Sequence, residues 1–270
     1  MRERRDAAAA AFQFLSRFPV KSQPGFSPEL LKRSVIYYPL VGAAIGLTTV
    51  IGAAVGEQLL PPLPAAVMTL ILWVALTGGL HLDGWMDSAD ALLSYRPRER
   101  MLEIMKDSRV GAMGVLACVL LLLLKVSLLA ALLEGGPVYE LPLLLLPFIW
   151  SRWFMVRAMR RWPLARAGEG LAASFAGLPP LYEKRALLSA ALLSLAAGAL
   201  PLLGEGEAAW PLVLAAVLLL PGAAWLCGTL AARRVSSRLG GLTGDVYGAL
   251  NELLEAALLL VLVLLQRNIM

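Results

Sequence analysis

The chain has 270 residues, of which 59% are hydrophobic and 16% are charged, and its formal net charge is +5. Because soluble domains usually contain about 45–50% apolar residues, this composition excludes an ordinary soluble protein and indicates an integral membrane protein. No basic patch is interleaved with aromatic residues, so we expect the lipid bilayer, and no nucleic acid, as the partner of the positive charge.

Seven apolar runs in the sequence are long enough to cross the hydrocarbon core of a bilayer, which takes roughly 17–25 residues. Backbone groups cannot stay unpaired in lipid, and the runs lack the alternating pattern of a barrel, so each run should be a helix. We therefore predict an all-α fold, a polytopic membrane helix bundle with about seven transmembrane helices plus interfacial helices, in a single domain over residues 1–270. The runs cover residues 35–56, 63–81, 110–133, 138–158, 186–204, 208–232 and 247–265.

The first polar segment, MRERRDAAAAAFQFLSRF, has a basic head like that of a signal peptide. Its apolar part is interrupted by Arg17 and no small-residue cleavage site follows, so we predict an interfacial helix instead. In the first run, Gly42, Gly46, Gly52 and Gly56 recur at a spacing that permits close approach of helices. This spacing predicts tight packing of that helix against its neighbours.

The segment HLDGWMDSADAL follows the second run and carries Asp83, Asp87 and Asp90. At ~100° per residue, a helix through this segment places the three carboxylates on one face, where like charges destabilise it. A hard divalent cation would compensate them, and Mg²⁺ is commonly held by one or two carboxylates together with substrate phosphates. The alternative is a solvated acidic face at a helix start, which needs no ligand.

His81, the only histidine in the chain, lies two residues before Asp83. It could form a hydrogen bond with a carboxylate at the membrane interface, or it could take part in proton transfer or phosphate contact. Gly84 would let a phosphate or an ion approach the backbone closely.

The stretch RPRERMLEIMKDSRVGAMG predicts an interfacial amphipathic helix, with Met101, Ile104 and Met105 on its apolar stripe. Lys106 and Arg109 follow at the mouth of the third run. These cations could bind phosphate oxygens, or they could anchor the helix end by extending toward the headgroups.

Charged residues inside the later runs need partners, because a charge in a membrane span is costly unless it is paired. Arg152 lies in the fourth run, and Asp245 and Glu252 share one face at the start of the last run, with Glu255 nearby. Lys125, in the middle of the third run, could pair with one of these acids.

The orientation in the membrane follows from Lys and Arg, which cytoplasmic loops retain. We predict a cytoplasmic N-terminus, three cytoplasmic polar loops and an outside C-terminus. Segments 1–34, 82–109, 159–185 and 233–246 hold seven, five, five and three basic residues, whereas 57–62, 134–137 and 205–209 hold none.

Several of these segments together closely resemble the bacterial cobalamin synthase family, the adenosylcobinamide-GDP ribazoletransferases. The similar stretches are HLDGWMDSADAL, RERMLEIMKDSRVGAMGVLA and GGLTGDVYGALNELLE, and more weakly FQFLSRFPV, the SR pair at 151–152 and ARAGEGLAASF. They run from about residue 12 to residue 256. The chain departs from the family at Trp85 and Met86 and in ALLSY after Asp90, which puts the shape of that loop in question and leaves the carboxylates intact.

The resemblance implies a phosphotransferase of the prokaryotic inner membrane, with its active site in the cytoplasm. It would join adenosylcobinamide-GDP to α-ribazole or its 5′-phosphate and release GMP, with Mg²⁺ as cofactor, in the last steps of vitamin B12 assembly. Other cobalamin-assembly enzymes are expected as partners, and the sequence leaves a homo-oligomer open.

The chemistry of this reaction suggests a candidate role for each residue noted above, whereas the resemblance supports the site more than the division of roles within it. By resemblance, the motif positions are His81, Asp83, Asp87, Asp90, Lys106, Asp107, Arg109, Thr243, Asp245 and Glu252. Mg²⁺ would be held by Asp83, Asp87 and Asp90. Asp90, or else His81, would take the proton of the nucleophile, and Asp107 is the third catalytic candidate. Substrate would be bound by Lys106, Arg109, Arg152, Thr243, Asp245, Asn251 and Glu252.

Two other classes of protein could explain acids beside a membrane. A membrane CDP-alcohol phosphotransferase uses a similar Asp-rich site, but its signature has an AR pair after DG and a further GxxxDxxxD, and neither is present in this segment. A divalent-cation transporter would also carry intramembrane acids. Here, however, the acids gather on one side of the membrane among cations suited to phosphate.

Overall fold

The computed structural model describes residues 2–22, 25, 27–135, 138–166, 168, 170–203 and 210–269. All predicted site residues fall within these ranges. The predicted loop 205–209, residues 136–137 of the loop 134–137 and residues 167 and 169 of ARAGEGLAASF lie outside the described residues.

The described residues form helices and no strand, which confirms the predicted all-α fold. Six helical stretches are long and apolar enough to cross a membrane, so the chain is a multi-pass membrane protein. The elements are α1 (Arg2–Leu15), α2 (Pro28–Ser34), η1 (Val35–Tyr37), α3 (Tyr38–Leu59), α4 (Pro62–Thr77), α5 (Leu80–Leu92), α6 (Arg98–Ile104), α7 (Ala112–Gly135), η2 (Val138–Leu144), α8 (Leu145–Arg161), η3 (Leu171–Phe175), α9 (Pro180–Leu202), α10 (Trp210–Leu239) and α11 (Gly244–Ile269).

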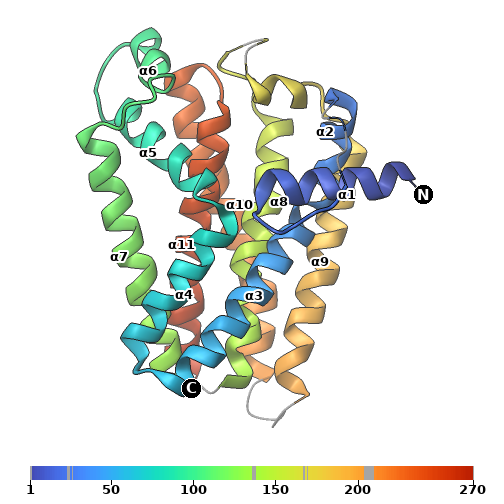
Figure 1. Cartoon of the computed structure of the whole chain (residues 1–270), viewed down its shortest axis with the longest axis vertical. Helices are drawn as coiled ribbons and strands as arrows, with labels where there is room; N and C mark the ends of the chain where they lie inside the picture. The colour runs from blue at the N-terminus through green and yellow to red at the C-terminus, as the bar shows by residue number, and fades with distance from the viewer. Residues whose placement is uncertain are drawn as a thin grey trace.

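The second predicted run, residues 63–81, is wrong at its end. Helix α4 stops at Thr77, and α5 leaves it at an angle of 91° (Figure 1). Gly78 and Gly79 have φ values of +66° and +73°, a left-handed conformation that ends a helix and that residues with a Cβ rarely adopt. His81 and the three aspartates therefore lie on a separate helix, and α4 with α5 forms a bent pair that is either a broken seventh span or a re-entrant loop.

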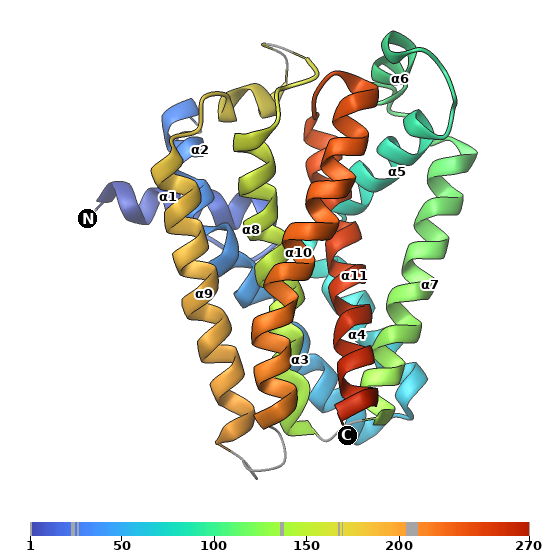
Figure 2. The same cartoon turned by 180° about the vertical axis from the view of Figure 1, so that it is seen from behind.

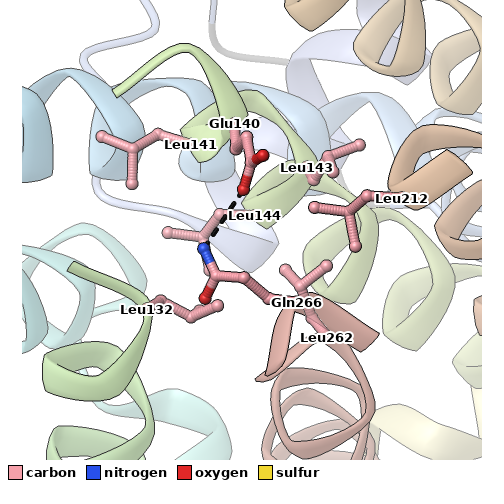
Figure 3. A pocket seen from close by; sticks show the side chains of 8 residues that line it. All are labelled: Leu132, Glu140, Leu141, Leu143, Leu144, Leu212, Leu262 and Gln266. Atoms are coloured by element: carbon pink, nitrogen blue, oxygen red, sulfur yellow. Dashed lines mark hydrogen bonds between the residues drawn. The ribbon is translucent and has the colours of Figure 1, made fainter. Parts of the chain in front are cut away.

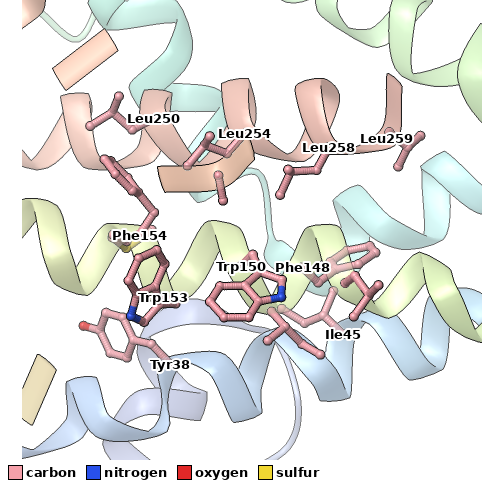
Figure 4. Packing of buried hydrophobic residues seen from close by; sticks show 14 of the residues in the cluster. Tyr38, Ile45, Phe148, Trp150, Trp153, Phe154, Leu250, Leu254, Leu258 and Leu259 are labelled. Carbon is pink, nitrogen blue, oxygen red and sulfur yellow. The ribbon is translucent and has the colours of Figure 1, made fainter. Parts of the chain in front are cut away.

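The core of the bundle surrounds α8, whose large aromatic side chains are buried. Gly42 of α3 faces α8 so closely that a Cβ at this position would collide with the carbonyl of Phe148, which confirms tight packing at that glycine. Figure 4 shows α8 between α3 and α11, with Phe148, Trp150, Trp153 and Phe154 placed between Tyr38 and Ile45 on one side and Leu250, Leu254 and Leu258 on the other.

One end of the bundle carries α5, α6, the described residues of the connection 162–179 and residues 240–243. We call it the acidic end because α5 carries Asp83, Asp87 and Asp90. The predicted basic segments gather there, and the C-terminus lies at the opposite end (Figures 1 and 2). Helix α1 lies across the bundle, at a large angle to the long helices, as an interfacial helix would (Figure 1).

The opposite end holds one small polar site, where Gln266 Nε2 donates to Glu140 Oε2 at 3.2 Å (Figure 3). The cavity beside this pair has a volume of about 20 Å³ and is otherwise lined by leucines. A water needs roughly 10–15 Å³ of such volume, so the cavity can hold a water and no substrate.

Candidate active site

Helix α5 packs directly against the first turn of α11. A Cβ at Gly84 would lie 2.5 Å from the backbone carbonyl oxygen of Asp245. Glycine is therefore needed here for the approach of α11, whereas the sequence suggested the approach of an ion or phosphate. This contact brings α5 and its aspartates beside Asp245, which lies more than 150 residues further along the chain.

Four carboxylates act on one another at this junction. The like charges of Asp83, Asp245 and Asp90 all bear on Asp87, which is half-buried. Within the described part of the chain, however, no three His, Cys, Asp or Glu side chains are arranged to hold a metal ion. The predicted Mg²⁺ site therefore stays a prediction, and the junction supplies concentrated negative charge without a complete set of ligands.

Asp90 ties α5 to α7. Its two carboxylate oxygens accept hydrogen bonds from the backbone N–H groups of Gly111 and Gly114, both at 2.7 Å. The first N–H groups of a helix have no partner within it, and a carboxylate there also favours the helix dipole. These contacts favour a positioning role for Asp90, while its predicted roles as metal ligand and base stay untested predictions.

A cavity of about 170 Å³ opens beside the junction, between α1, α5, α8, η3 and α11. Its lining differs in chemistry from element to element. Asp83, His81 and Asp245 come from α5 and α11, and we call them the polar wall. Phe14, Leu15, Met155, Met159 and Phe175 come from α1, α8 and η3, and we call them the apolar wall.

Two buried donors face this cavity without a protein partner. His81 is 2% exposed and Tyr247 is 3% exposed, and neither His81 Nε2 nor the Tyr247 hydroxyl has a hydrogen-bond partner among the described residues. An unpaired buried donor costs free energy comparable to a lost hydrogen bond. Both groups are therefore ready to bind an acceptor atom of a ligand.

Asn251 fixes the tautomer of His81. Its amide nitrogen donates to Glu255 Oε1 at 3.1 Å and also lies 3.1 Å from His81 Nδ1. Because a carboxylate only accepts, the nitrogen between the two partners must be the NH₂ group, and Nδ1 of His81 must accept. The proton of His81 is then on Nε2, so this geometry favours His81 as a donor toward the cavity, and its predicted role as a base stays a prediction.

A buried ionic network lies next to His81 and is joined to it through Asn251. Lys125 Nζ is 2.6 Å from both Glu252 Oε2 and Glu255 Oε2, and Arg152 pairs with Glu255. All four side chains are at most 3% exposed. The predicted pairing of Lys125 with an acid of the last run is confirmed.

This network includes or adjoins three of the predicted substrate-binding residues, whose predicted role stays a prediction. Arg152 and Asn251 are fully buried and Glu252 is 3% exposed, and none of the three lines the cavity. Arg152 pairs with Glu255, Glu252 pairs with Lys125, and Asn251 contacts His81 and Glu255. A charge inside a membrane bundle is costly unless it is paired, so these contacts favour a supporting role beside the cavity.

The predicted residues after α6 are exposed. Lys106 is exposed at the end of α6, and Arg109 donates from Nε and Nη2 to Asp107 at 3.0 and 2.7 Å. Hydrogen bonds from the side chain and backbone of Arg109 lower the pKa of Asp107 to about 2. Asp107 is thus a weak base, and this geometry does not favour its predicted catalytic role.

Thr243 begins α11. Its hydroxyl accepts from the backbone N–H of Val246 at 3.3 Å and donates to Asp245 Oδ2 at 3.3 Å, so it orients Asp245. Arg166 Nη2 lies 4.0 Å from the same Oδ2 and donates to the carbonyl of Leu102 at 3.0 Å. Sequence reasoning missed Arg166, although it lies in the family-like segment ARAGEGLAASF, because its partner could be identified only in three dimensions.

Comparison with known proteins identifies the family of this chain. The family described as cobalamin-5-phosphate synthase matches residues 7–263. A protein of Brevibacillus brevis is 40% identical over 94% of this chain and 96% of its own length. One of Desulfitobacterium hafniense is 41% identical over 93% of both chains, and one of Pseudomonas paraeruginosa is 42% identical over 98% of this chain and its whole length. All three are named adenosylcobinamide-GDP ribazoletransferase, and no solved structure matches. The chain belongs to the cobalamin-5-phosphate synthase family.

Proposed function

We propose that this protein transfers the adenosylcobinamide-phosphate group of adenosylcobinamide-GDP to α-ribazole or α-ribazole 5′-phosphate and releases GMP, in the last steps of vitamin B12 biosynthesis. Family membership supports the reaction. The observation that carries the assignment to a site is the two-walled cavity, in which buried donors and an apolar wall meet the carboxylates of α5 and α11.

The cavity fits the aromatic base of ribazole. Pockets for whole ligands usually measure about 300–1,000 Å³, so a volume of about 170 Å³ suits one part of a substrate and excludes the corrinoid. Ribazole has a flat apolar base, which would pack on Met155, Met159 and Phe175. His81 Nε2–H or the Tyr247 hydroxyl would donate to its ring nitrogen, and the sugar would point to Asp83 and Asp245.

The chemistry then assigns a role to each group at the cavity edge. The sugar hydroxyl of ribazole attacks the phosphorus that is bonded to cobinamide, and the bond from this phosphorus to the GMP oxygen breaks. Asp245, oriented by Thr243, receives the proton of that hydroxyl and later returns it to solvent. Lys106, Arg109 and Arg166 bind phosphate oxygens, for which Arg109 exchanges its contact with Asp107.

Asp83 and Asp87 fit the demands of a divalent cation. They lie one helical turn apart on α5, and Asp87 also feels the like charges of Asp90 and Asp245. Mg²⁺ is usually held by one or two carboxylates plus substrate phosphates, so a site without three protein ligands suits it. When bound, Mg²⁺ would neutralise charge on the phosphates and polarise them.

We place the acidic end in the cytoplasm of a prokaryote, with the N-terminus, while the C-terminus lies outside the inner membrane. The concentration of Lys and Arg at that end supports this orientation. It also gives the site access to GDP-activated substrate and released GMP. A homo-oligomer and contacts with other cobalamin-assembly enzymes remain parts of the proposal.

Release of GMP tests the function. Purified protein in nanodiscs receives adenosylcobinamide-GDP and α-ribazole, each alone and both together, with and without Mg²⁺. We expect release only with both substrates and Mg²⁺, and a loss of at least about 100-fold in Asp83→Asn. Asp6→Asn, the same change in α1, is the matched control and should retain activity.

The rival functions give different results in the same assay. A folded protein that releases no GMP but forms phospholipid from a CDP-activated lipid precursor would be a CDP-alcohol phosphotransferase. A protein that releases no GMP but moves Mg²⁺ across a sealed liposome would be a transporter. Either result would contradict the proposal.

A further inference from the structure

A second and larger cavity lies away from the active site, on the side of the bundle where α1 passes α2 and η1. Its volume is about 880 Å³, and α9 forms its other wall. Figure 2 shows α1 and α2 beside the upper part of α9, toward the acidic end. None of its lining residues lines the cavity beside α5 and α11.

One part of this cavity is basic. Arg4 of α1, Arg33 of α2 and Arg185 of α9 line it, with Glu3 as the one acid among its lining residues. Glu3 pairs with Arg33, whereas no ion-pair partner of Arg4 or Arg185 is found among the described residues. The lining therefore has a net positive charge, carried by three elements that are distant in sequence.

The other part of the cavity is apolar and lies deeper along α9. Leu188 and Leu192 follow Arg185 by about one and two helical turns. They are 61% and 58% exposed, so nothing in the described protein covers them. Tyr37 and Tyr182 line the cavity near the arginines, and tyrosines are enriched at the level of the lipid headgroups.

We propose that this cavity binds one anionic phospholipid of the leaflet on the acidic side. The arginines contact the lipid phosphate and the negatively charged headgroup, and an acyl chain lies along Leu188 and Leu192. Basic pockets between membrane helices suit anionic headgroups, and a strip of exposed leucine below the charge requires a hydrocarbon chain. A free phosphate would satisfy only the first feature.

The lipid would hold α1 in place. Arg4, near the start of α1, lines the lipid cavity, while Phe14 and Leu15, at its other end, line the cavity beside α5. A lipid that fixes the start of α1 therefore also supports the apolar wall of the second cavity. This link concerns positioning, and the lipid site itself stands whether or not the proposed transferase activity is correct.

Native mass spectrometry of the protein released from mixed nanodiscs of phosphatidylglycerol and phosphatidylcholine tests the proposal. The readout is the ratio of the two lipids that stay bound. The test variant is Arg4→Gln with Arg185→Gln, and the control is Arg233→Gln with Arg234→Gln, which removes the same charge from exposed positions of α10. Arg33 is kept because its pair with Glu3 joins α2 to α1.

We expect wild type and the control to retain phosphatidylglycerol preferentially. In the test variant the preference should fall by about fivefold for each arginine removed. Leu188→Asn, which keeps all charges, should reduce retention of both lipids. A single monodisperse peak in size-exclusion chromatography of each variant in phosphatidylcholine nanodiscs establishes that the variant is folded.

Three results would overturn the proposal. Equal loss in the α10 control would mean a general effect of charge and no defined site. Unchanged retention in the test variant would mean that the arginines do not bind the lipid. Displacement of the bound lipid by glycerol phosphate, which has no acyl chain, would mean that the site recognises phosphate alone.

Discussion

His81 connects the active-site cavity to the buried network through a single amide. Asn251 holds its Nδ1 as an acceptor, so Nε2–H is presented to the ligand. In the proposed function this arrangement would make His81 a group that binds and orients substrate.

The tautomer of His81 can be tested by removing and restoring one donor. In His81→Phe the hydrogen bond to ribazole is lost, and its KM should rise about 3- to 10-fold, because one hydrogen bond contributes about 0.5–1.5 kcal/mol. His81→Gln can place an amide N–H near the position of Nε2 and should restore most of the affinity. Steady-state kinetics measures both. Loss of kcat in His81→Gln, with KM unchanged, would instead indicate a catalytic base.

Removing one charge from the ionic network next to His81 should destabilise the protein strongly. Removing an oppositely charged pair should destabilise it much less. Lys125→Met leaves Glu252 buried without its cation, which costs about 3–5 kcal/mol. Adding Glu252→Met removes that charge and leaves Arg152 with Glu255, so much of the stability should return. Thermal unfolding in detergent gives the comparison. If the double variant melts no higher than Lys125→Met, the two residues do not act as a pair.

The sequence predicted which charged residues need a partner better than it predicted which residues those partners are. The sequence indicated that Lys125 needs an acid, because a charge in a span must be paired. It could not indicate that Glu255 also pairs with Arg152, or that Asn251 contacts His81 across 170 residues, because these contacts depend on how α11 packs. Arg152 was therefore expected at a phosphate and is instead buried.

At the scale of elements, the contact between α5 and α7 decides what Asp90 does. Asp90→Asn keeps an oxygen that can accept from Gly111 or Gly114, whereas Asp90→Leu keeps none. If Asp90 positions α7, Asn should retain activity within about tenfold of wild type and Leu should lose stability by about 0.5–2 kcal/mol. GMP release and thermal unfolding of both variants measure this. A loss of about 100-fold or more in a stable Asp90→Asn would restore its predicted role as ligand or base.

The helices could be predicted from hydropathy alone, because six of the apolar runs match single long helical stretches. The break between α4 and α5 could not be predicted in this way, since residues 63–81 are continuously apolar. The signal was the pair Gly78 and Gly79, whose left-handed conformation turns the chain. Glycine pairs in a run also serve close packing, so their spacing alone does not distinguish a bend from a contact.

At the scale of the molecule, the orientation follows from where the basic residues lie. Arg233→Cys at the acidic end and Gln58→Cys at the opposite end can be compared after Cys118 and Cys227 are replaced by alanine. We expect a membrane-impermeant maleimide to label Gln58→Cys in intact spheroplasts and to label Arg233→Cys only after lysis. The reverse pattern would place the acidic end outside the cell.

The overall arrangement could be predicted in part. The number of spans and the grouping of basic segments at one end agree with the structure, because lipid constrains both. The joining of α5 to the start of α11 could not be predicted from either segment alone, since Gly84 shows its role only against Asp245. The residues of α1 and η3 in the apolar wall lie in the weakly family-like stretches FQFLSRFPV and ARAGEGLAASF, but neither stretch indicates by itself that the two meet at one cavity.

The most direct test of this account is the KM for α-ribazole when the cavity is filled. Ala172 lines the cavity and its neighbour Ala173 does not, so Ala172→Phe and Ala173→Phe form a matched pair. We predict that Ala172→Phe raises the KM for α-ribazole about tenfold or more and leaves that for adenosylcobinamide-GDP unchanged, while Ala173→Phe changes neither. An unchanged KM for α-ribazole in Ala172→Phe, or a rise only in that for adenosylcobinamide-GDP, would contradict the assignment of this cavity to ribazole.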